Sequence, residues 1–233
     1  MTSIPTNFTE AFGGNIGDAI VDPYSVYARL RQEAPCLRFD TMFGDMYFVT
    51  TYAGVKRVLE NPSHFSSRIN DRLIGTVIGS TIIGMDEPDH NAMRRLVMPF
   101  FVPSAIHRIE DSIRGVAVEM VDRLSGKTEA DLVSEFVFTY PLAVFDRLML
   151  GAHLDDAAQF HEWVRSFLKL TTNPQEAMMA VMQIREFLAP VIARARSSGA
   201  THTLVERLAQ AEVDGERLSD DQVTSFLILL LQA

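Results

Sequence analysis

The chain has 233 residues, of which 21 are Lys or Arg and 30 are Asp or Glu, so its formal net charge is −9. A hydrophobic fraction of 47% and a charged fraction of 22% are ordinary for a globular protein and exclude the disordered, collagen-like and disulfide-rich classes. The acidic balance argues against general nucleic-acid binding, which needs a basic surface.

One cysteine, Cys36, rules out an internal disulfide and favours a reducing compartment. We expect its side chain to be a small buried apolar group. The longest uninterrupted apolar runs, 177–182 and 226–231, have six residues each, whereas a membrane span needs about 20. The sequence therefore predicts a cytoplasmic protein with no membrane partner and no nucleic-acid partner.

Near the N-terminus, the sequence predicts a helix followed by a β-hairpin. Asp22 before Pro23 is a favourable N-cap and first-turn pair for a helix. Residues 37–50 are rich in strand-forming side chains on both sides of Gly44, which predicts a hairpin with its turn there. A short helix around residues 55–59 follows.

Residues 65–85 break the helical pattern, because three glycines interrupt a series of Ile and Val residues. Loops normally lie on the surface, so a loop this apolar is expected to cover something. Beyond it, apolar residues recur at intervals of three and four and predict a series of helices. Their expected ranges are 88–97, 104–125, 141–150, 160–168 and 174–198, and two capping boxes predict further starts at Thr203 and Ser219. The expected fold class is mainly α with a small β-hairpin element.

The last predicted helix, from Ser219 onward, is nearly all apolar and shows no stop signal. Such a helix is normally buried on all sides. We expect its apolar side chains to lack a partner within this chain. Residues 1–233 are accordingly expected to form a single incomplete domain, the front part of a larger fold.

Residues 85–97 hold the one group of side chains that points to a chemical role. On a helix that starts near Pro88, His90 and Arg94 are four residues apart and lie on one face. Two donors on one face can bind an anionic group, although a solvated helix face also explains the pair. The sequence has no phosphate loop, nucleophile elbow or zinc-protease motif, so we assign no catalytic and no metal-ligating residue.

The stretch 85–97 resembles the C-helix of the soluble bacterial cytochromes P-450, whose pattern is Asp-Pro-Pro-x-His-Thr-x-x-Arg-Arg-Leu-Val. Further resemblances follow in the family's order, and together they make the chain similar to the N-terminal half of such an enzyme, ending at the start of its central I-helix. They lie at residues 22–31, 65–67, 131–151 and 214–231.

This chain also departs from the family pattern. Glu87 replaces the first Pro of the motif, and Pro99 should end the helix early. The family's oxygen-activating and cysteine-ligand motifs would follow Ala233, and Cys36 lies in the wrong region to bind the iron.

The resemblance implies haem b as cofactor, with its propionates held by His90 and Arg94 and its ligand cysteine outside this chain. The parent would be a monooxygenase that hydroxylates a small, mostly apolar molecule with O2 and two electrons from a ferredoxin or flavoprotein donor. This chain alone would be inactive. A second hypothesis is a non-catalytic P-450-like partner protein, such as a glycosyltransferase activator, because some of these lack the thiolate ligand.

The resemblance also implies a substrate site between the loop before the C-helix and the last helix. Its expected residues are Ile78, Ile82, Ile83, Leu229, Gln232 and Ala233. Core packing explains the isoleucines equally well. Gln232 stands where the family has an apolar residue, and we expect its amide to bind an oxygen-bearing group of the substrate or a water beside it.

Overall fold

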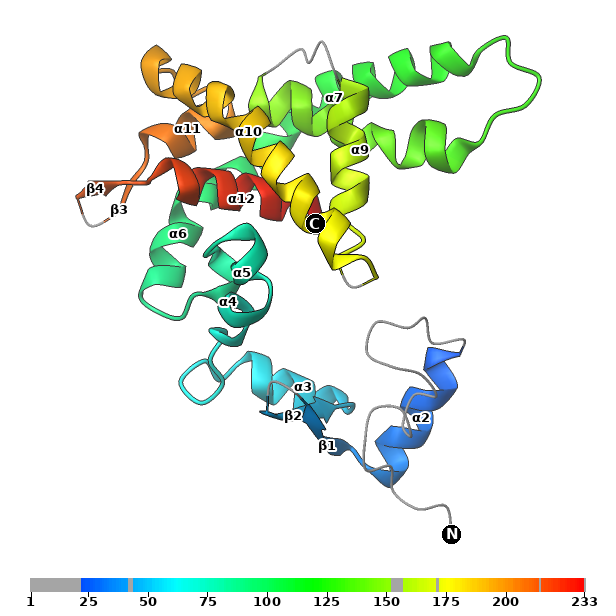
Figure 1. The fold of residues 1–233 in the computed structure, drawn as a ribbon, viewed down its shortest axis with the longest axis vertical. Helices are drawn as coiled ribbons and strands as arrows, with labels where there is room; N and C mark the ends of the chain where they lie inside the picture. The colour runs from blue at the N-terminus through cyan, green and yellow to red at the C-terminus, as the bar shows by residue number, and fades with distance from the viewer. Residues whose placement is uncertain (1–21, 42–43, 152–156, 171, 214, 233) are drawn as a thin grey trace. The chain divides into compact units, whose positions relative to one another are not determined.

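The computed structural model describes residues 22–41, 44–151, 157–170, 172–213 and 215–232. The chain divides into two compact units, Met1–Ser66 and Ser67–Ala233. Figure 1 colours the chain from its N-terminus in blue to its C-terminus in red.

The first unit joins helices to a two-stranded antiparallel sheet. It contains α2 (Pro23–Glu33), β1 (Cys36–Thr41), β2 (Gly44–Val49) and α3 (Tyr52–Leu59). The side chain of Asp22 caps α2 by accepting a hydrogen bond from the backbone N–H of Ser25, as the sequence predicts. Leu30 and Ala34, at the end of α2, pack with Leu37 of β1 in a small core.

Two expectations for this unit are wrong. Thr41 pairs with Gly44 in the antiparallel register, so Gly44 begins β2 instead of forming the turn. Cys36 is exposed and not buried. Cys36 is the first residue of β1 and pairs with Val49, the last residue of β2, so it lies at the open end of the hairpin, where few side chains cover it.

The second unit is helical. Its first part contains α4 (Ile69–Leu73), α5 (Gly75–Ile78), a 3-10 turn (Ile82–Gly84), α6 (Asp89–Val97), a second 3-10 turn (Met98–Phe100) and α7 (Pro103–Leu124). The segment expected to be a loop thus contains two short helices, and Gly79 ends the second of them with a φ of +88°. Pro99 falls in the 3-10 turn that terminates α6, which confirms the predicted early end.

The remaining elements follow in chain order. They are η3 (Val133–Val137), α8 (Thr139–Val144), η4 (Phe145–Leu150), α9 (Ala157–Phe167), α10 (Pro174–Ser198), α11 (Leu204–Gln210), β3 (Glu212–Val213), β4 (Glu216–Arg217) and α12 (Asp220–Gln232). α8 begins at Thr139, two residues before the predicted start at Pro141, and the π-helical turns η3 and η4 lie on either side of it. Pro141 instead lies in the first turn of α8, where an amide N–H is least needed.

Both predicted capping boxes are confirmed. Thr203 and Glu206 exchange side-chain and backbone hydrogen bonds at the start of α11. Ser219 and Gln222 do the same at the start of α12, with distances of 2.8 and 3.1 Å.

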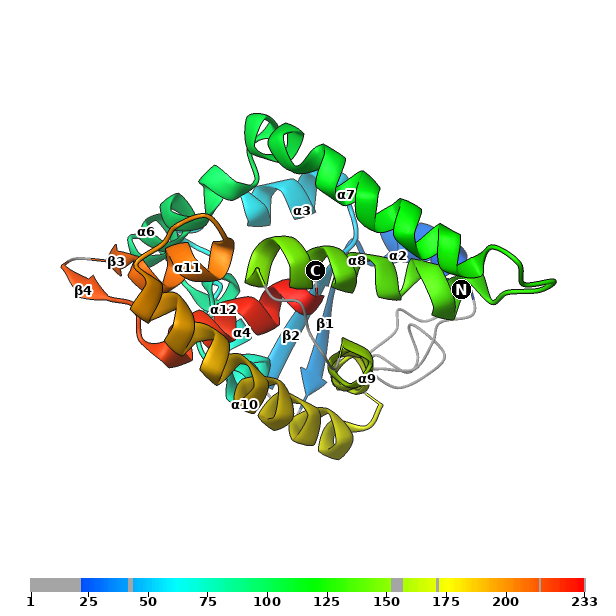
Figure 2. The ribbon, with the colours of Figure 1, turned by 90° about the horizontal axis from the view of Figure 1, so that it is seen from above.

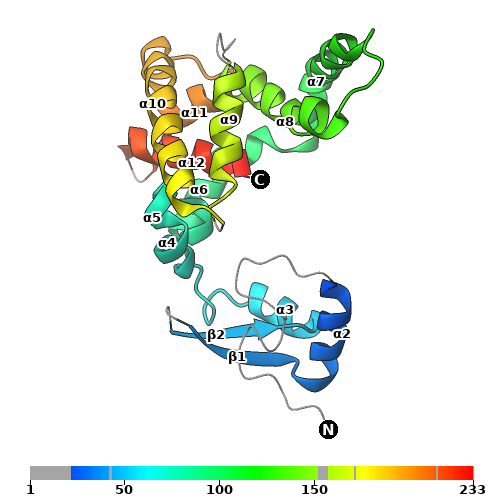
Figure 3. The ribbon, with the colours of Figure 1, turned by 45° about the vertical axis from the view of Figure 1, so that its right-hand side comes forward.

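The hydrophobic core of the second unit is centred on α10. This helix packs against α9, α11 and α12, and Figure 3 shows α9 and α10 side by side. α8 runs alongside α7 at the edge of the unit (Figure 2). The largest fully buried side chains of this core are Ile78, Phe160, Phe167, Ile184, Leu188, Ile192, Leu204, Leu208, Leu227 and Ile228.

The final helix is packed, contrary to the expectation that its apolar side chains lack a partner. Leu227 is 0% and Phe226 4% exposed, because α10, α11 and α5 cover α12. Leu229 and Leu230 are partly buried against the same core. No helix among the described residues, α12 included, combines the length and apolar character that crossing a bilayer requires.

Candidate functional site

α6 carries the predicted anion-binding side chains. Met93 and Val97, each 6% exposed, form its buried face and pack into the core. Asp89 lies in the first turn, and Arg94 and Arg95 lie in the last, which is the order that the helix dipole favours. The side of α6 that faces away from the core is therefore polar and accessible.

His90 and Arg94 share one face of this helix, as their spacing predicts. His90 is half-buried and Arg94 is exposed. Neither side chain forms an ion pair or hydrogen bond with another of the described residues. Both are therefore available to an external anion, as far as the described part of the chain is concerned.

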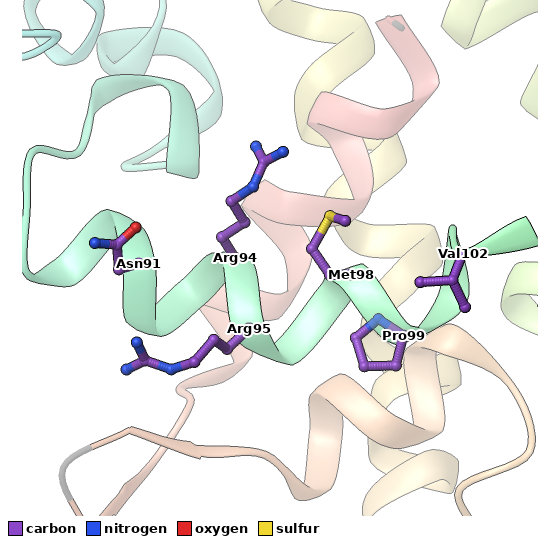
Figure 4. A pocket seen from close by; sticks show the side chains of 6 residues that line it. All are labelled: Asn91, Arg94, Arg95, Met98, Pro99 and Val102. Carbon is purple, nitrogen blue, oxygen red and sulfur yellow. The ribbon is translucent and has the colours of Figure 1, made fainter. Parts of the chain in front are cut away.

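A pocket of about 530 Å³ lies beside this face. It is lined by Asn91, Arg94, Arg95, Met98, Pro99 and Val102. Figure 4 shows Arg94 and Met98 on one side of the helical segment and Arg95 on the other. Two guanidinium groups and no carboxylate line the pocket, so its chemistry favours a carboxylate or another planar anion.

The donor set fits the carboxylates of the expected haem b. A guanidinium can bind a carboxylate through two parallel hydrogen bonds, and an imidazole one turn earlier adds a further donor. No group of three or more His, Cys, Asp or Glu side chains within the described ranges could hold a metal ion. The haem iron of the resembled family takes a single protein ligand, so the fit of haem to these residues rests on its propionates alone.

The loop before α6 is closed by side chains at its two ends. The carboxylate of Asp86 accepts a hydrogen bond from the backbone N–H of Ser67 at 2.8 Å and one from Arg68 Nε at 3.3 Å. Further along, the Asn70 side chain donates to the carbonyl oxygen of Ile83 at 2.9 Å. These contacts join the start of the loop to the residues that lead into α6.

The three predicted isoleucines of this loop differ in their surroundings. Ile78 is fully buried in the core, and Ile82 is partly buried against it. Ile83 is 39% exposed. The burial of Ile78 is what core packing predicts, and Ile82 and Ile83 retain surface that a ligand could contact.

The predicted residues of the last helix lie at its C-terminal end. Leu229 is partly buried against the same core as Ile78 and Ile82. Gln232 is half-buried. Ala233 lies outside the described residues. α5 contacts α12, so the start of the loop lies against this helix. That the predicted residues of the two segments form one substrate site stays a prediction.

Sequence reasoning missed Arg185 of α10. Its Nη2 donates a hydrogen bond to the carbonyl oxygen of Ile78 at 2.7 Å. The available signal was its spacing, since Arg185 is four residues after Val181 and three before Leu188, both of which are buried. A charged residue at that position must find a polar partner in the core.

A buried polar contact between η4 and α9 was also missed. His161 Nε2 lies 3.2 Å from Asp146 Oδ2, and Asp146 is 5% exposed. Burial raises the pKa of the Asp146 carboxyl, and the hydrogen bond from His161 opposes that shift. The second carboxylate oxygen of Asp146 has no hydrogen-bond partner among the described residues.

Comparison with known proteins shows which family this chain matches. A family model described as cytochrome P450 matches residues 12–233. Cytochrome P450 107B1 of Saccharopolyspora erythraea is 29% identical over 227 residues, which cover 91% of this chain and 55% of that protein. The methyl-branched lipid omega-hydroxylase of Mycobacterium tuberculosis is 32% identical over 228 residues, covering 89% of this chain and 53% of that protein.

Solved structures show the same fold. The Bacillus subtilis polyketide synthase cytochrome P450 PksS matches with a TM-score of 0.78 and 25% identity, covering 91% of this chain and 55% of that one. CYP109E1 from Bacillus megaterium in complex with testosterone matches with a TM-score of 0.72 and 29% identity, covering 91% and 55%. The chain thus spans about half the length of the proteins it matches.

Proposed function

Because the chain belongs to the cytochrome P450 family, we propose that it supplies the propionate-binding helix and part of the substrate pocket of a haem monooxygenase. The observation that carries the proposal is the paired placement of His90 and Arg94 on the accessible face of α6, beside a pocket lined by guanidinium groups. Residues 1–233 would be one incomplete domain of that enzyme.

The family depends on haem, which when bound supplies the transfer of one oxygen atom from O2 to a substrate. The residues of this chain would bind the haem and orient it. The Arg94 guanidinium would pair with one propionate carboxylate, and His90 would donate a hydrogen bond to the same edge of the haem. The positive charge of Arg94 would offset the negative charge that the propionates bring to the site.

We propose a mostly apolar substrate with at least one oxygen. Ile82, Ile83 and Leu229 would form an apolar wall that excludes water, whereas Ile78 is fully buried and would not reach the substrate. Gln232 would donate a hydrogen bond to the substrate oxygen or to a water beside it. The names of two similar proteins support this class, since one is a methyl-branched lipid hydroxylase and another was solved with testosterone.

The electrons would come from a ferredoxin or flavoprotein, the donors expected for this family. A cytoplasmic location fits a chain with a single, exposed cysteine, since such a thiol stays reduced in that compartment.

Haem retention in the full-length protein tests the proposal. Arg94→Ala should lower the fraction of haem retained after dilution by roughly tenfold or more, since a charge-assisted bidentate contact contributes about 1.5–3 kcal/mol. The matched control is Arg108→Ala, an exposed arginine of α7 outside this pocket, which should retain haem like the wild type. Equal retention in the two variants would contradict the role of Arg94. A full-length protein that binds no haem would favour the non-catalytic partner instead.

A further inference from the structure

Arg185 joins three segments that are far apart in the sequence. Its Nη2 donates to the carbonyl oxygen of Ile78 at 2.7 Å, and its Nη1 lies 3.5 Å from Asp221 Oδ1. Ile78 is the last residue of α5, and carbonyls at a helix end have no partner within the helix. Arg185 therefore caps the C-terminus of α5 from a different helix, α10.

Gly79 shows how closely this point of the loop approaches α12. Its φ of +88° lies in the region that favours glycine. A Cβ atom there would overlap the hydroxyl of Ser225 and would lie 3.2 Å from Arg185 Nη2. The backbone after Ile78 thus contacts α12 with no room for a side chain.

The contact falls on the face of α12 that carries candidate substrate residues. Ser225, Leu229 and Gln232 are separated by four and three residues, so they share one face of the helix. The loop is consequently held against the second turn of α12, at Ser225, and Leu229 and Gln232 follow one and two turns later on the same face.

We propose that Arg185 is a positioning residue that fixes residues 75–84 against α12 and thereby sets one wall of the substrate pocket. The role of that wall in binding rests on the proposed function, whereas the fixing of the loop does not. The hydrogen bond to Ile78 carries the effect, because Ile78 is fully buried. The Asp221 side chain is 94% exposed, and ion pairs that exposed contribute little.

Hydrogen exchange in the full-length protein tests the fixing of the loop. In Arg185→Gln, the backbone amides of residues 75–84 should exchange about tenfold faster or more, because a charge-assisted hydrogen bond that opposes local opening is lost. Arg185→Lys keeps one charged donor and should show a smaller increase in the exchange rate of these amides. This variant also tests the inference if Arg185→Gln does not fold. Asp221→Asn and Arg194→Gln, an exposed arginine on the same helix, should exchange like the wild type.

Wild-type exchange rates in Arg185→Gln would overturn the inference, and so would an equal acceleration in Arg194→Gln. The wall is tested in the haem-loaded protein by a spin-state titration with testosterone as an apolar, oxygen-bearing probe. Arg185→Gln should bind it about tenfold more weakly at unchanged haem content, with partial recovery in Arg185→Lys. If the amides of residues 75–84 exchange faster in Arg185→Gln but testosterone binds with unchanged affinity, the loop does not form a wall of the substrate pocket.

The two proposals can fail separately. If the loop exchanges faster in Arg185→Gln but no haem is bound even by the wild type, the fixing of the loop stands and the proposed function does not. If exchange is unchanged while haem and testosterone bind normally, Arg185 loses its role and the proposed function stands.

Discussion

Replacing Arg196 with alanine removes the contacts that hold the start of α12 to the rest of the second unit. Arg196 lies near the end of α10, and all three guanidinium nitrogens are used. Nη1 donates to the carbonyl oxygen of Ala209 at 2.5 Å, Nη2 donates to that of Leu218 at 2.6 Å, and Nε lies 2.6 Å from Asp220 Oδ1. One side chain thus connects α10, the end of α11 and the segment before α12.

The structure sets the size of the expected loss. Ala209 and Leu218 are 0% and 4% exposed. In Arg196→Ala, their buried carbonyl oxygens would each lose the charged guanidinium donor. Each such hydrogen bond contributes about 1.5–3 kcal/mol, which gives about 3–6 kcal/mol for the pair. The lower end applies, because the Arg196 side chain is 23% exposed and water can enter when it is removed. The Asp220 pair adds at most about 1 kcal/mol, since that carboxylate is 67% exposed.

We therefore expect Arg196→Ala to lower the free energy of unfolding by about 3–4 kcal/mol, measured by urea denaturation, or Tm by about 6–16 °C. Asp220→Asn keeps both carbonyl contacts and should lose less than about 1 kcal/mol. Arg194→Ala, exposed on the same helix, should change stability by less than about 0.5 kcal/mol. A loss below about 1 kcal/mol in Arg196→Ala would refute the assigned role of the two carbonyl contacts.

Two further predictions concern stability. Burial raises the pKa of Asp146, so the folded protein keeps that proton where the unfolded chain releases it. The stability that this group contributes is full below its ordinary pKa and is lost as the pH rises through the raised value. Asp146→Asn should flatten that part of the curve of urea midpoint against pH, and an unchanged curve would exclude Asp146 as its source. Gly79→Ala should lower the unfolding free energy by about 2–4 kcal/mol in urea denaturation, through a strained φ and a clash with Ser225. Gly126→Ala has a similar φ of +93° but open space around it, so it should lose only about 1 kcal/mol, and equal losses in the two would exclude the clash.

The elements that sequence predicts well are those fixed by neighbouring residues. The cap at Asp22, the capping boxes at Thr203 and Ser219, and the end of α6 at Pro99 depend on contacts within four residues, and all are confirmed. The burial of α12 was missed because its apolar side chains are covered by helices that begin as far back as residue 75. Periodicity shows that a face is apolar but does not show what covers it.

The candidate site likewise has one part that follows from local sequence and one part that depends on tertiary packing. His90 and Arg94 are one helical turn apart, so their common face follows from spacing alone. Arg185 and Ile78 are 107 residues apart, and their hydrogen bond depends on how α10 packs against α5. Nothing in the local sequence around either residue encodes that pairing. The turn of the first hairpin was misplaced because Gly44, with a φ of +97°, has a turn-like backbone although it pairs with Thr41 as the first residue of β2.

The closure of the loop by Asp86 has a consequence for how this protein can vary. One carboxylate holds Ser67 and Arg68, so the entry to the loop and the residues leading into α6 are joined before the chain reaches the helix. The exposed side chains between these points, such as Arg72, Leu73 and Thr76, can change without loss of that closure. Ile78 and Gly79 cannot, because Ile78 is buried in the core and Gly79 lies against α12. Variation in this segment is therefore expected at its outward-facing positions, while the helix that carries His90 and Arg94 keeps its starting point.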